Sequence, residues 1–506
     1  MFPVLRLFFA VSALLAAFSA LAEADPAARV GRIALLDGPT LFRTDRDDAG
    51  NPASLNWPIS SGAILDTETG SRAEVWIGST AYRLAGDTRL EFANVDDRRV
   101  TLHQASGTLA ITVRDRDQAD DIEVRTPNGQ VRFGAPGRYR IDVGGGRTNV
   151  AAASGIAYVY GDRTITVDAG RTASIDPNGA VALYGESLHD GFDDWVAQRE
   201  AATRPRVAQR YVSPAMTGYQ DLDRYGDWGS VPDYGTVWYP RAVPVGWAPY
   251  RYGRWAWIPP WGWTWVDEAP WGFAPFHYGR WVEVRGRWGW VPGAYVARPV
   301  YAPALVAWIG NPGWSVSLSV GSGPAVGWFP LAPREVYVPA YRASPTYIRQ
   351  VNVTQVTNVT VINRAVADRD HHRYVHRDSP RAVTVAPVNA VREGAPVRSS
   401  AWSGRDRAQL REAPVSARAP AENWLPPPTG RGRGESAARR ENEHGRPPSP
   451  SVLGTAPGRD GRAGGGEPRP LPSNIDRLPA AGRDAPPVAR DPRPLPPSID
   501  RQSGER

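Results

Sequence analysis

A motif of tyrosine, glycine and tryptophan that occurs three times constrains the fold of this chain more than any other feature. The sequence YGDW at residues 225–228 recurs as YGRW at 252–255 and again at 278–281. Each copy is followed, after a turn rich in Gly or Pro, by a second stretch rich in tryptophan. The spacing suits one β-hairpin per copy, and units this short must stack or pair to bury an apolar face. We therefore predict a Trp-rich β-hairpin repeat domain over residues 211–341.

Composition supports a mainly β, multi-domain protein. With 506 residues the chain is too long for one ordinary domain, and its 51 Gly and 49 Pro disfavour long helices. Residues 28–185 contain many short segments of alternating polarity, separated by Gly, Pro, Asp or Asn, a pattern that is typical of a β-domain. Nucleic-acid binding is disfavoured, because the arginines are interspersed with acids rather than gathered on one face.

The first 22 residues have the pattern of a secretory signal peptide. Arg6 precedes an apolar run, and the sequence Ala-Leu-Ala ending at Ala22 fits a cleavage site. We expect a periplasmic or secreted protein, with no transmembrane segment after cleavage. The chain has no cysteine, so disulfides and thiolate chemistry are excluded.

The remaining segments have distinct expectations. Apolar residues at three- and four-residue steps in 190–202 predict one helix, so residues 186–210 are interpreted as a helix and linker that closes the β-domain. Residues 342–377 are predicted to be a β-type ribbon and linker, because Val or Ile alternates with Asn, Thr and Gln in 348–363. The Pro-, Arg- and Gly-rich residues 378–506 lack apolar periodicity and are predicted to be a disordered tail.

The aromatic residues of the second repeat are the candidate ligand-binding residues. Exposed rings bordered by carboxylates are typical of sugar-binding surfaces, whereas buried rings would supply the core of a small repeat that lacks disulfides. We keep both interpretations: the rings form either a buried core or an exposed platform that binds a ligand. The candidates are Trp255, Trp257, Trp261, Trp263, Trp265, Asp267, Glu268 and His277.

No catalytic, metal or cofactor site is predicted. The chain contains no G-x-S-x-G or H-E-x-x-H sequence. Asp267 and Glu268 are adjacent, and neighbouring strand residues point to opposite faces, which does not suit the opposed carboxylates of a glycosidase. His371, His372 and His376 are interpreted as part of a solvated linker rather than a metal site.

Two stretches resemble known families of bacterial envelope proteins. The sequence GSRAEV at 70–75, AYRL at 81–84, TRLEF at 88–92 and the later segment from 125 to 140 resemble the FecR domain over residues 30–175. That resemblance implies a periplasmic β-domain that can relay a signal. The sequence from 219 to 341 resembles the uncharacterised domain that follows FecR domains in secreted proteobacterial proteins, and its WVP and YGRW pieces are similar to tryptophan–glycine repeats.

These observations predict a non-enzymatic envelope protein that acts as a scaffold or a binding module. Its expected partner is an envelope protein or a polysaccharide such as peptidoglycan. Periplasmic signal input is the first alternative, and a glycan-active enzyme is the second.

Overall fold

A computed structural model describes residues 25–44, 46–185, 189–309, 319–320, 323–367, 373–397 and 412–419. Every described residue belongs to Met1–Arg431, the first of the two units into which the chain divides. The predicted signal peptide and most of the predicted tail lie outside the described residues. Among the helices that are described, none is long and apolar enough to cross a membrane.

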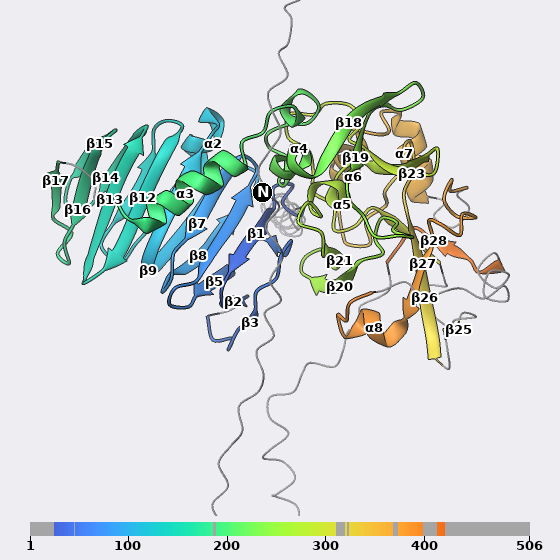
Figure 1. Ribbon diagram of the computed structural model, residues 1–506, viewed down its shortest axis with the longest axis horizontal. Helices are drawn as coiled ribbons and strands as arrows, with labels where there is room; N and C mark the ends of the chain where they lie inside the picture. The colour runs from blue at the N-terminus through green and yellow to red at the C-terminus, as the bar shows by residue number, and fades with distance from the viewer. Residues whose placement is uncertain are drawn as a thin grey trace, which may run out of the picture. The chain divides into compact units, whose positions relative to one another are not determined.

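The first lobe, which we call the β-sandwich lobe, consists of two sheets that share the long strand β9 (Figure 1). Neighbouring strands pair antiparallel except for β9 with β10, which are parallel. One sheet has the order β4 (Pro58–Ile59), β1 (Gly31–Asp37), β6 (Arg72–Ile77), β7 (Thr80–Leu84), β9 (Val100–Val113), β12 (Gly137–Gly144), β13 (Arg147–Ser154), β16 (Arg171–Ile175) and β17 (Val181–Tyr184). The other has the order β3 (Asn51–Pro52), β2 (Thr40–Arg43), β5 (Ala63–Thr67), β8 (Arg89–Val95), β9, β10 (Ile122–Arg125), β11 (Gln130–Phe133), β14 (Ile156–Tyr160) and β15 (Thr164–Asp168).

The alternation of polar and apolar residues decides which side of each strand faces the core. In β12, Tyr139, Ile141 and Val143 are buried, while Arg140 and Asp142 between them are half-buried on the opposite side. Both sheets contribute to one apolar core. Strand β9 passes from one sheet to the other at Gly107, whose φ of +82° and close approach to Thr88 leave no room for a side chain. The predicted β-domain is therefore a sandwich.

The predicted helix is present as α3 (Gly191–Ala202) and lies across the sheet that contains β7, β9 and β12 (Figure 1). Asp190 caps it with a capping box, and Phe192 and Val196 pack against Ala110. A shorter helix, α2 (Arg116–Asp121), follows β9.

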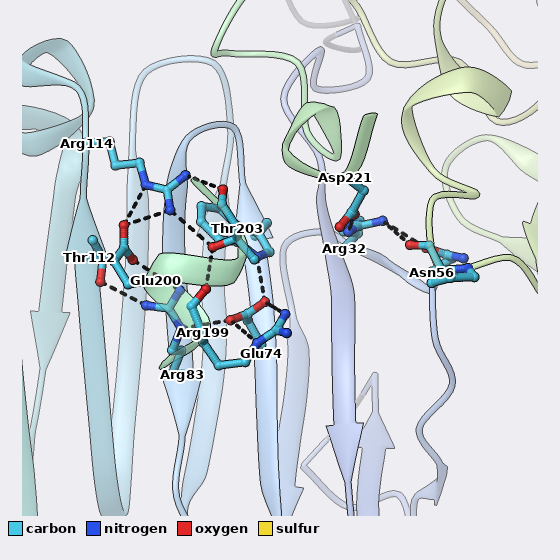
Figure 2. Close-up of polar contacts among 12 residues, drawn as sticks. Arg32, Asn56, Glu74, Arg83, Thr112, Arg114, Arg199, Glu200, Thr203 and Asp221 are labelled. Atoms are coloured by element: carbon cyan, nitrogen blue, oxygen red, sulfur yellow. Dashed lines mark hydrogen bonds and ion pairs between the residues drawn. The ribbon is translucent and has the colours of Figure 1, made fainter. Parts of the chain in front are cut away.

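A buried ion-pair network fastens α3 to the sheet (Figure 2). Glu74 of β6 accepts hydrogen bonds from Arg83 Nε at 2.8 Å and from Arg199 Nη2 of α3 at 2.7 Å. Glu200, also on α3, pairs with Arg114 at 2.7 Å. Although burial alone would raise it, the pKa of Glu74 is lowered to about 2 by these two arginines.

The second lobe, which we call the aromatic lobe, begins at Ala208 and includes all described residues that follow it. Its elements are η2 (Ala208–Arg210), η3 (Tyr219–Asp221), α4 (Leu222–Tyr225), β18 (Gly226–Val231), β19 (Gly235–Pro240), β20 (Gly253–Ile258), β21 (Gly262–Asp267), α5 (Ala274–His277), β22 (Arg280–Val284), β23 (Arg287–Val291), β24 (Val306–Ile309), β25 (Ser319–Val320), β26 (Gly323–Pro330), α6 (Pro345–Asn352), α7 (Val359–Ala367), β27 (Thr384–Pro387), α8 (Val388–Arg392) and β28 (Val415–Ser416).

The three copies of the motif form three antiparallel hairpins, β18–β19, β20–β21 and β22–β23. In each hairpin the tryptophan of the motif pairs with a tryptophan on the returning strand. The glycine of the motif lies against the indole of that second tryptophan: Gly226 against Trp238, Gly253 against Trp265 and Gly279 against Trp290. A Cβ atom at these glycines would meet ring atoms at 2.1, 2.6 and 2.5 Å. The repeat thus encodes a glycine–indole contact.

The prediction of a β-type ribbon over residues 342–377 is wrong. Residues 345–352 form α6, and residues 359–367 form α7. Ser344 caps α6 by accepting a hydrogen bond from Tyr347 N, and Pro345 occupies the first turn, where proline is tolerated. Helical spacing places Tyr347 and Val351 on the buried side. The alternation of apolar and polar residues suited a strand. The helix forms instead because Ser344 caps it and because its apolar side packs on the core.

The predicted disordered tail is also corrected in part. Residues 384–387 form β27, 388–392 form α8 and 415–416 form β28. Val383, Val385, Val391 and Val397 are buried in the core of the aromatic lobe. Each of these segments is ordered by contacts with distant strands. Such contacts do not require a periodic pattern within the segment itself.

Candidate functional site

Four of the five candidate tryptophans lie in the core of the aromatic lobe. Trp255 and Trp265 are fully buried, and Trp261 and Trp263 are 2% and 3% exposed. Trp257 is half-buried. The platform interpretation is therefore wrong for the four buried rings, because their faces are covered by other parts of the same chain.

The covering residues come from segments far along the sequence. Trp255 packs against Trp308 of β24 and Trp328 of β26, with ring centroids 4.4 and 5.4 Å apart. Trp261 packs edge-on against Tyr301 at 5.0 Å. Burial of these large rings supplies much of the apolar area of a lobe that has no disulfides.

The candidate acids have opposite environments. Asp267 is buried, and its carboxylate accepts hydrogen bonds from Trp265 Nε1 and from Ala269 N, both at 2.9 Å. Burial raises the pKa of Asp267 to about 8. Glu268 is exposed. The two carboxyls therefore do not form an opposed pair in a shared cleft, and Asp267 is a structural acid that fixes the end of β21.

The candidate His277 is buried in the core. Its Nδ1 lies 2.8 Å from Ala302 O, and its ring stacks on Tyr301 at a centroid distance of 4.7 Å. Burial lowers the pKa of His277 to about 3, so the ring is neutral at physiological pH. Of the histidines interpreted as linker, His371 and His372 lie outside the described residues, whereas His376 is buried against the carbonyl of Trp281. Within the described ranges, no three His, Asp or Glu side chains are grouped as a metal site.

An open groove of about 950 Å³ runs beside these buried residues. The β-sandwich lobe contributes Ser60, Ser61 and Val95 to its lining, and the aromatic lobe contributes the Pro259–Pro260 turn of the second hairpin and Tyr341. Ser61, Pro259 and Pro260 are exposed, and Tyr341 is half-buried. The surface is a mixture of proline, hydroxyl and aromatic groups with few carboxylates.

A buried polar latch holds the two lobes together (Figure 2). Arg32 of β1 forms an ion pair with Asp221 and donates to Asn56 Oδ1 at 3.1 Å. The amide nitrogen of Asn56 donates to Asp267 O at 2.9 Å and to Ala269 O at 2.7 Å. Because every partner is buried or half-buried, separation of the lobes would leave charged and amide groups without partners.

Sequence reasoning missed both the groove and the latch. Asn56 lies in an irregular segment between β3 and β4, and its φ of +60° is a conformation that asparagine tolerates better than most residues. No local pattern connects Asn56 to residues more than 200 positions away. The single usable signal was the Pro-Pro-Trp turn within the repeat, where the exposed prolines follow the half-buried Trp257 and precede the buried Trp261.

Comparison with known proteins gives a partial match. A family model, "Family of unknown function (DUF6600)", matches residues 219–335, which corresponds to the three hairpins and the strands up to β26. No curated protein matches this chain. The resemblance of residues 30–175 to the FecR domain stays a prediction.

Two crystal structures of a Parabacteroides distasonis protein, described as a candidate anti-sigma factor, are similar to part of the chain. They were solved at 1.65 and 2.50 Å resolution, with 14% and 15% identity and a TM-score of 0.23 each. Each match covers 26% of this chain and 64% or 63% of the other, so this chain spans less than two thirds of their length.

Proposed function

We propose that this is a non-enzymatic protein of the bacterial envelope that acts as a scaffold or binding module, and that its partner is a protein rather than a glycan. The groove between the two lobes carries this proposal. Its walls come from both lobes, and the buried latch fixes one against the other, so the binding surface is formed in advance.

The chemistry of the groove favours a polypeptide partner. Stacking on sugars requires an exposed ring face, yet the tryptophan that borders the groove, Trp261, is 2% exposed. Exposed prolines and serine hydroxyls with a half-buried tyrosine instead suit an extended peptide segment, which offers both apolar side chains and backbone hydrogen-bonding groups.

Site-specific photo-crosslinking tests the proposal. A photoreactive residue at Ser61 or at Pro260 should capture the same protein from envelope extracts, whereas one at Ala169, in the exposed β15–β16 turn, should not. Capture at all three positions alike, or at none, would contradict a binding groove. If the captured protein is a membrane protein, the result favours signal input over a scaffold role.

A variant that blocks the groove tests the same site by measuring the affinity for the captured protein. Ser61→Arg should weaken binding of the captured protein by roughly tenfold, about 1.4 kcal/mol, since a long side chain would fill the groove. Ala169→Arg adds the same charge elsewhere and should leave binding unchanged. Co-sedimentation with peptidoglycan that Ser61→Arg abolishes, without any protein captured, would instead indicate a glycan ligand.

A further inference from the structure

The tripeptide Ala-Pro-Val occurs three times in this chain, at residues 386–388, 395–397 and 413–415. All three copies lie after the region that matches the family model, which ends at residue 335. All three are in segments that the composition alone suggested would be disordered. Their positions in the fold are related.

Each copy, or the residue beside it, pairs with a different strand of the aromatic lobe. Strand β27, which includes Ala386 and Pro387, pairs with β26. Val397 forms a bridge to Gly253 at the start of β20, with Val397 N donating to Gly253 O at 2.6 Å. Strand β28, which begins at Val415, pairs with β24. The lobe therefore holds three segments with this tripeptide against different strands, two by strand pairing, which is the geometry of β-strand addition, and one by a single bridge.

The side chains show what these edges recognise. Ala386, Val397 and Ala413 are buried against the lobe, whereas Pro396 and Pro414 are exposed. These three buried side chains are small or β-branched and belong to the same core as the buried tryptophans. Proline cannot donate a backbone hydrogen bond, so it leaves the outer side of the added strand unsuited to further pairing.

The third edge is covered by a very short strand with a cavity beneath it. Strand β28 contributes only the pairs Ile309 with Val415 and Trp308 with Ser416. Beneath it, Ala417 and Ala419 border a cavity of about 20 Å³ together with Trp255 and Trp263.

The indole N–H groups of Trp255 and Trp263 are buried and have no hydrogen-bond acceptor among the described residues. A buried donor without an acceptor is unfavourable. The chain's own segment therefore fits the shape of this edge without satisfying its polar groups.

We propose that the edge of β24 is a receptor for an extended peptide with a small residue, a proline and a β-branched residue in sequence, and that residues 412–419 occupy it as an internal ligand. The external occupant is a segment of a partner protein with this chemistry, whose backbone carbonyls accept from Trp255 and Trp263. No residue of β24 lines the groove, although Trp261 borders both the groove and the cavity beneath this edge, so the inference goes beyond the function proposed above.

A binding experiment on the full-length chain tests the proposal. The probe is a fluorescent peptide with the sequence of residues 412–420, EAPVSARAP. The internal segment competes at a high effective concentration, so the unaltered protein should bind the probe weakly. The double variant Ser416→Pro and Ala417→Asp, which removes a backbone donor and places a charge against the indoles, should bind at least about tenfold more tightly.

Two controls make the outcome decisive. Arg418→Ala alters an exposed side chain of the same segment and should leave the affinity as weak as in the unaltered protein. A probe with Asp at the position of Val415 should not bind the double variant. Absence of tighter binding by a double variant that keeps the native circular dichroism spectrum and tryptophan emission would overturn the proposal.

A second measurement covers the case in which the double variant does not fold. A photoreactive probe at the position of Val415, incubated in excess with the unaltered protein, should crosslink to residues 306–309. Crosslinks confined to other segments would overturn the proposal. A dimer in light scattering that dissociates in the double variant would also overturn it, because the occupant would then be a second copy of this chain. Neither result affects the crosslinking from Ser61 and Pro260, so the two proposals fail independently.

Discussion

At the scale of single residues, the repeated glycine explains why the three hairpins share one sequence. Gly226 has an ordinary extended backbone, with a φ of −154°, so its conformation alone would accept any residue. What excludes a side chain is the indole of Trp238, which lies 2.1 Å from where a Cβ atom would be. At Gly226 the constraint is therefore purely steric, whereas Gly279 also has a φ of +65° that favours glycine.

Replacement of Gly226 by alanine should destabilise the aromatic lobe by about 1–3 kcal/mol, because the added methyl group must displace a buried ring. The measurement is urea denaturation followed by tryptophan fluorescence. Gly144→Ala is the matched control, since no atom lies within 4 Å of the place that its Cβ atom would take, and it should leave the midpoint unchanged. Equal shifts for both substitutions would show that the glycine–indole contact is not what the motif preserves.

Asp267 should make the stability of the folded protein dependent on pH. Burial raises its folded-state pKa from 3.8 to about 8, so folding binds a proton between these values. The stability that protonated Asp267 contributes is fully present below about pH 4 and is lost as the pH rises through about 8. Burial also raises the pKa of Glu335 from 4.5 to about 7. The stability that Glu335 contributes is therefore likewise lost as the pH rises through about 7.

Asp267→Asn should flatten this dependence between pH 5 and 9, because the amide cannot ionise; its single oxygen can replace only one of the two carboxylate oxygens that accept from Trp265 Nε1 and Ala269 N. Melting temperatures across that range provide the measurement, with the exposed Asp168→Asn as control. An unchanged slope in Asp267→Asn would mean that the carboxylate is ionised in the folded protein.

At the scale of elements, α3 is held by charge as well as by apolar contact. The carboxylate of Glu74 is fully buried between Arg83 and Arg199, and the pair Glu200–Arg114 extends the network to the end of the helix. Removal of one member of such a network leaves the remaining charges desolvated without a partner. The helix therefore depends on this strand residue for its position.

Glu74→Gln should lower the free energy of unfolding by about 3–5 kcal/mol, since Arg83 and Arg199 both lose their ion pair with this buried carboxylate. Asp194→Asn, on the exposed side of the same helix, should change it little. Guanidinium denaturation of the two variants gives the comparison. Because the pKa of Glu74 is lowered from 4.5 to about 2, its contribution is present above pH 4.5 and is lost as the pH falls through about 2. If Glu74→Gln were as stable as Asp194→Asn, the network would be dispensable.

At the scale of the whole molecule, the latch of Arg32, Asn56 and Asp221 couples the two lobes. Asn56→Gly should weaken that coupling, because glycine keeps the positive φ but removes the amide that binds the carbonyls of Asp267 and Ala269. Calorimetry should then show two separate transitions in place of one. Asn178→Gly, in an exposed turn, is the control. A single transition in both variants would show that the latch does not join the lobes thermodynamically.

Local sequence patterns were sufficient to predict the secondary-structure type, strand or helix, of most elements. Period-two alternation predicted the strands of the sandwich, and helical spacing with Asp193 and Asp194 in the first turn predicted α3. The local patterns failed at residues 345–367, which include the stretch 348–363 where Val or Ile alternates with Asn, Thr and Gln. There Asn352 is buried, receives hydrogen bonds from Arg280 and Tyr337, and donates to Tyr337 O and Ile348 O. A polar residue that is fully satisfied inside a core has no signature in sequence alone.

The candidate site was predicted less well for a related reason. The sequence by itself determined that residues 225–291 form three hairpins with paired tryptophans, because turns, glycines and strand pairing act over fewer than 30 residues. It could not determine which face of each hairpin meets solvent. Only the tertiary structure decided that Trp255, Trp263 and Trp265 are core, because burial depends on β24, β26 and the Ala-Pro-Val segments, which pack on them from 40 to 160 residues away.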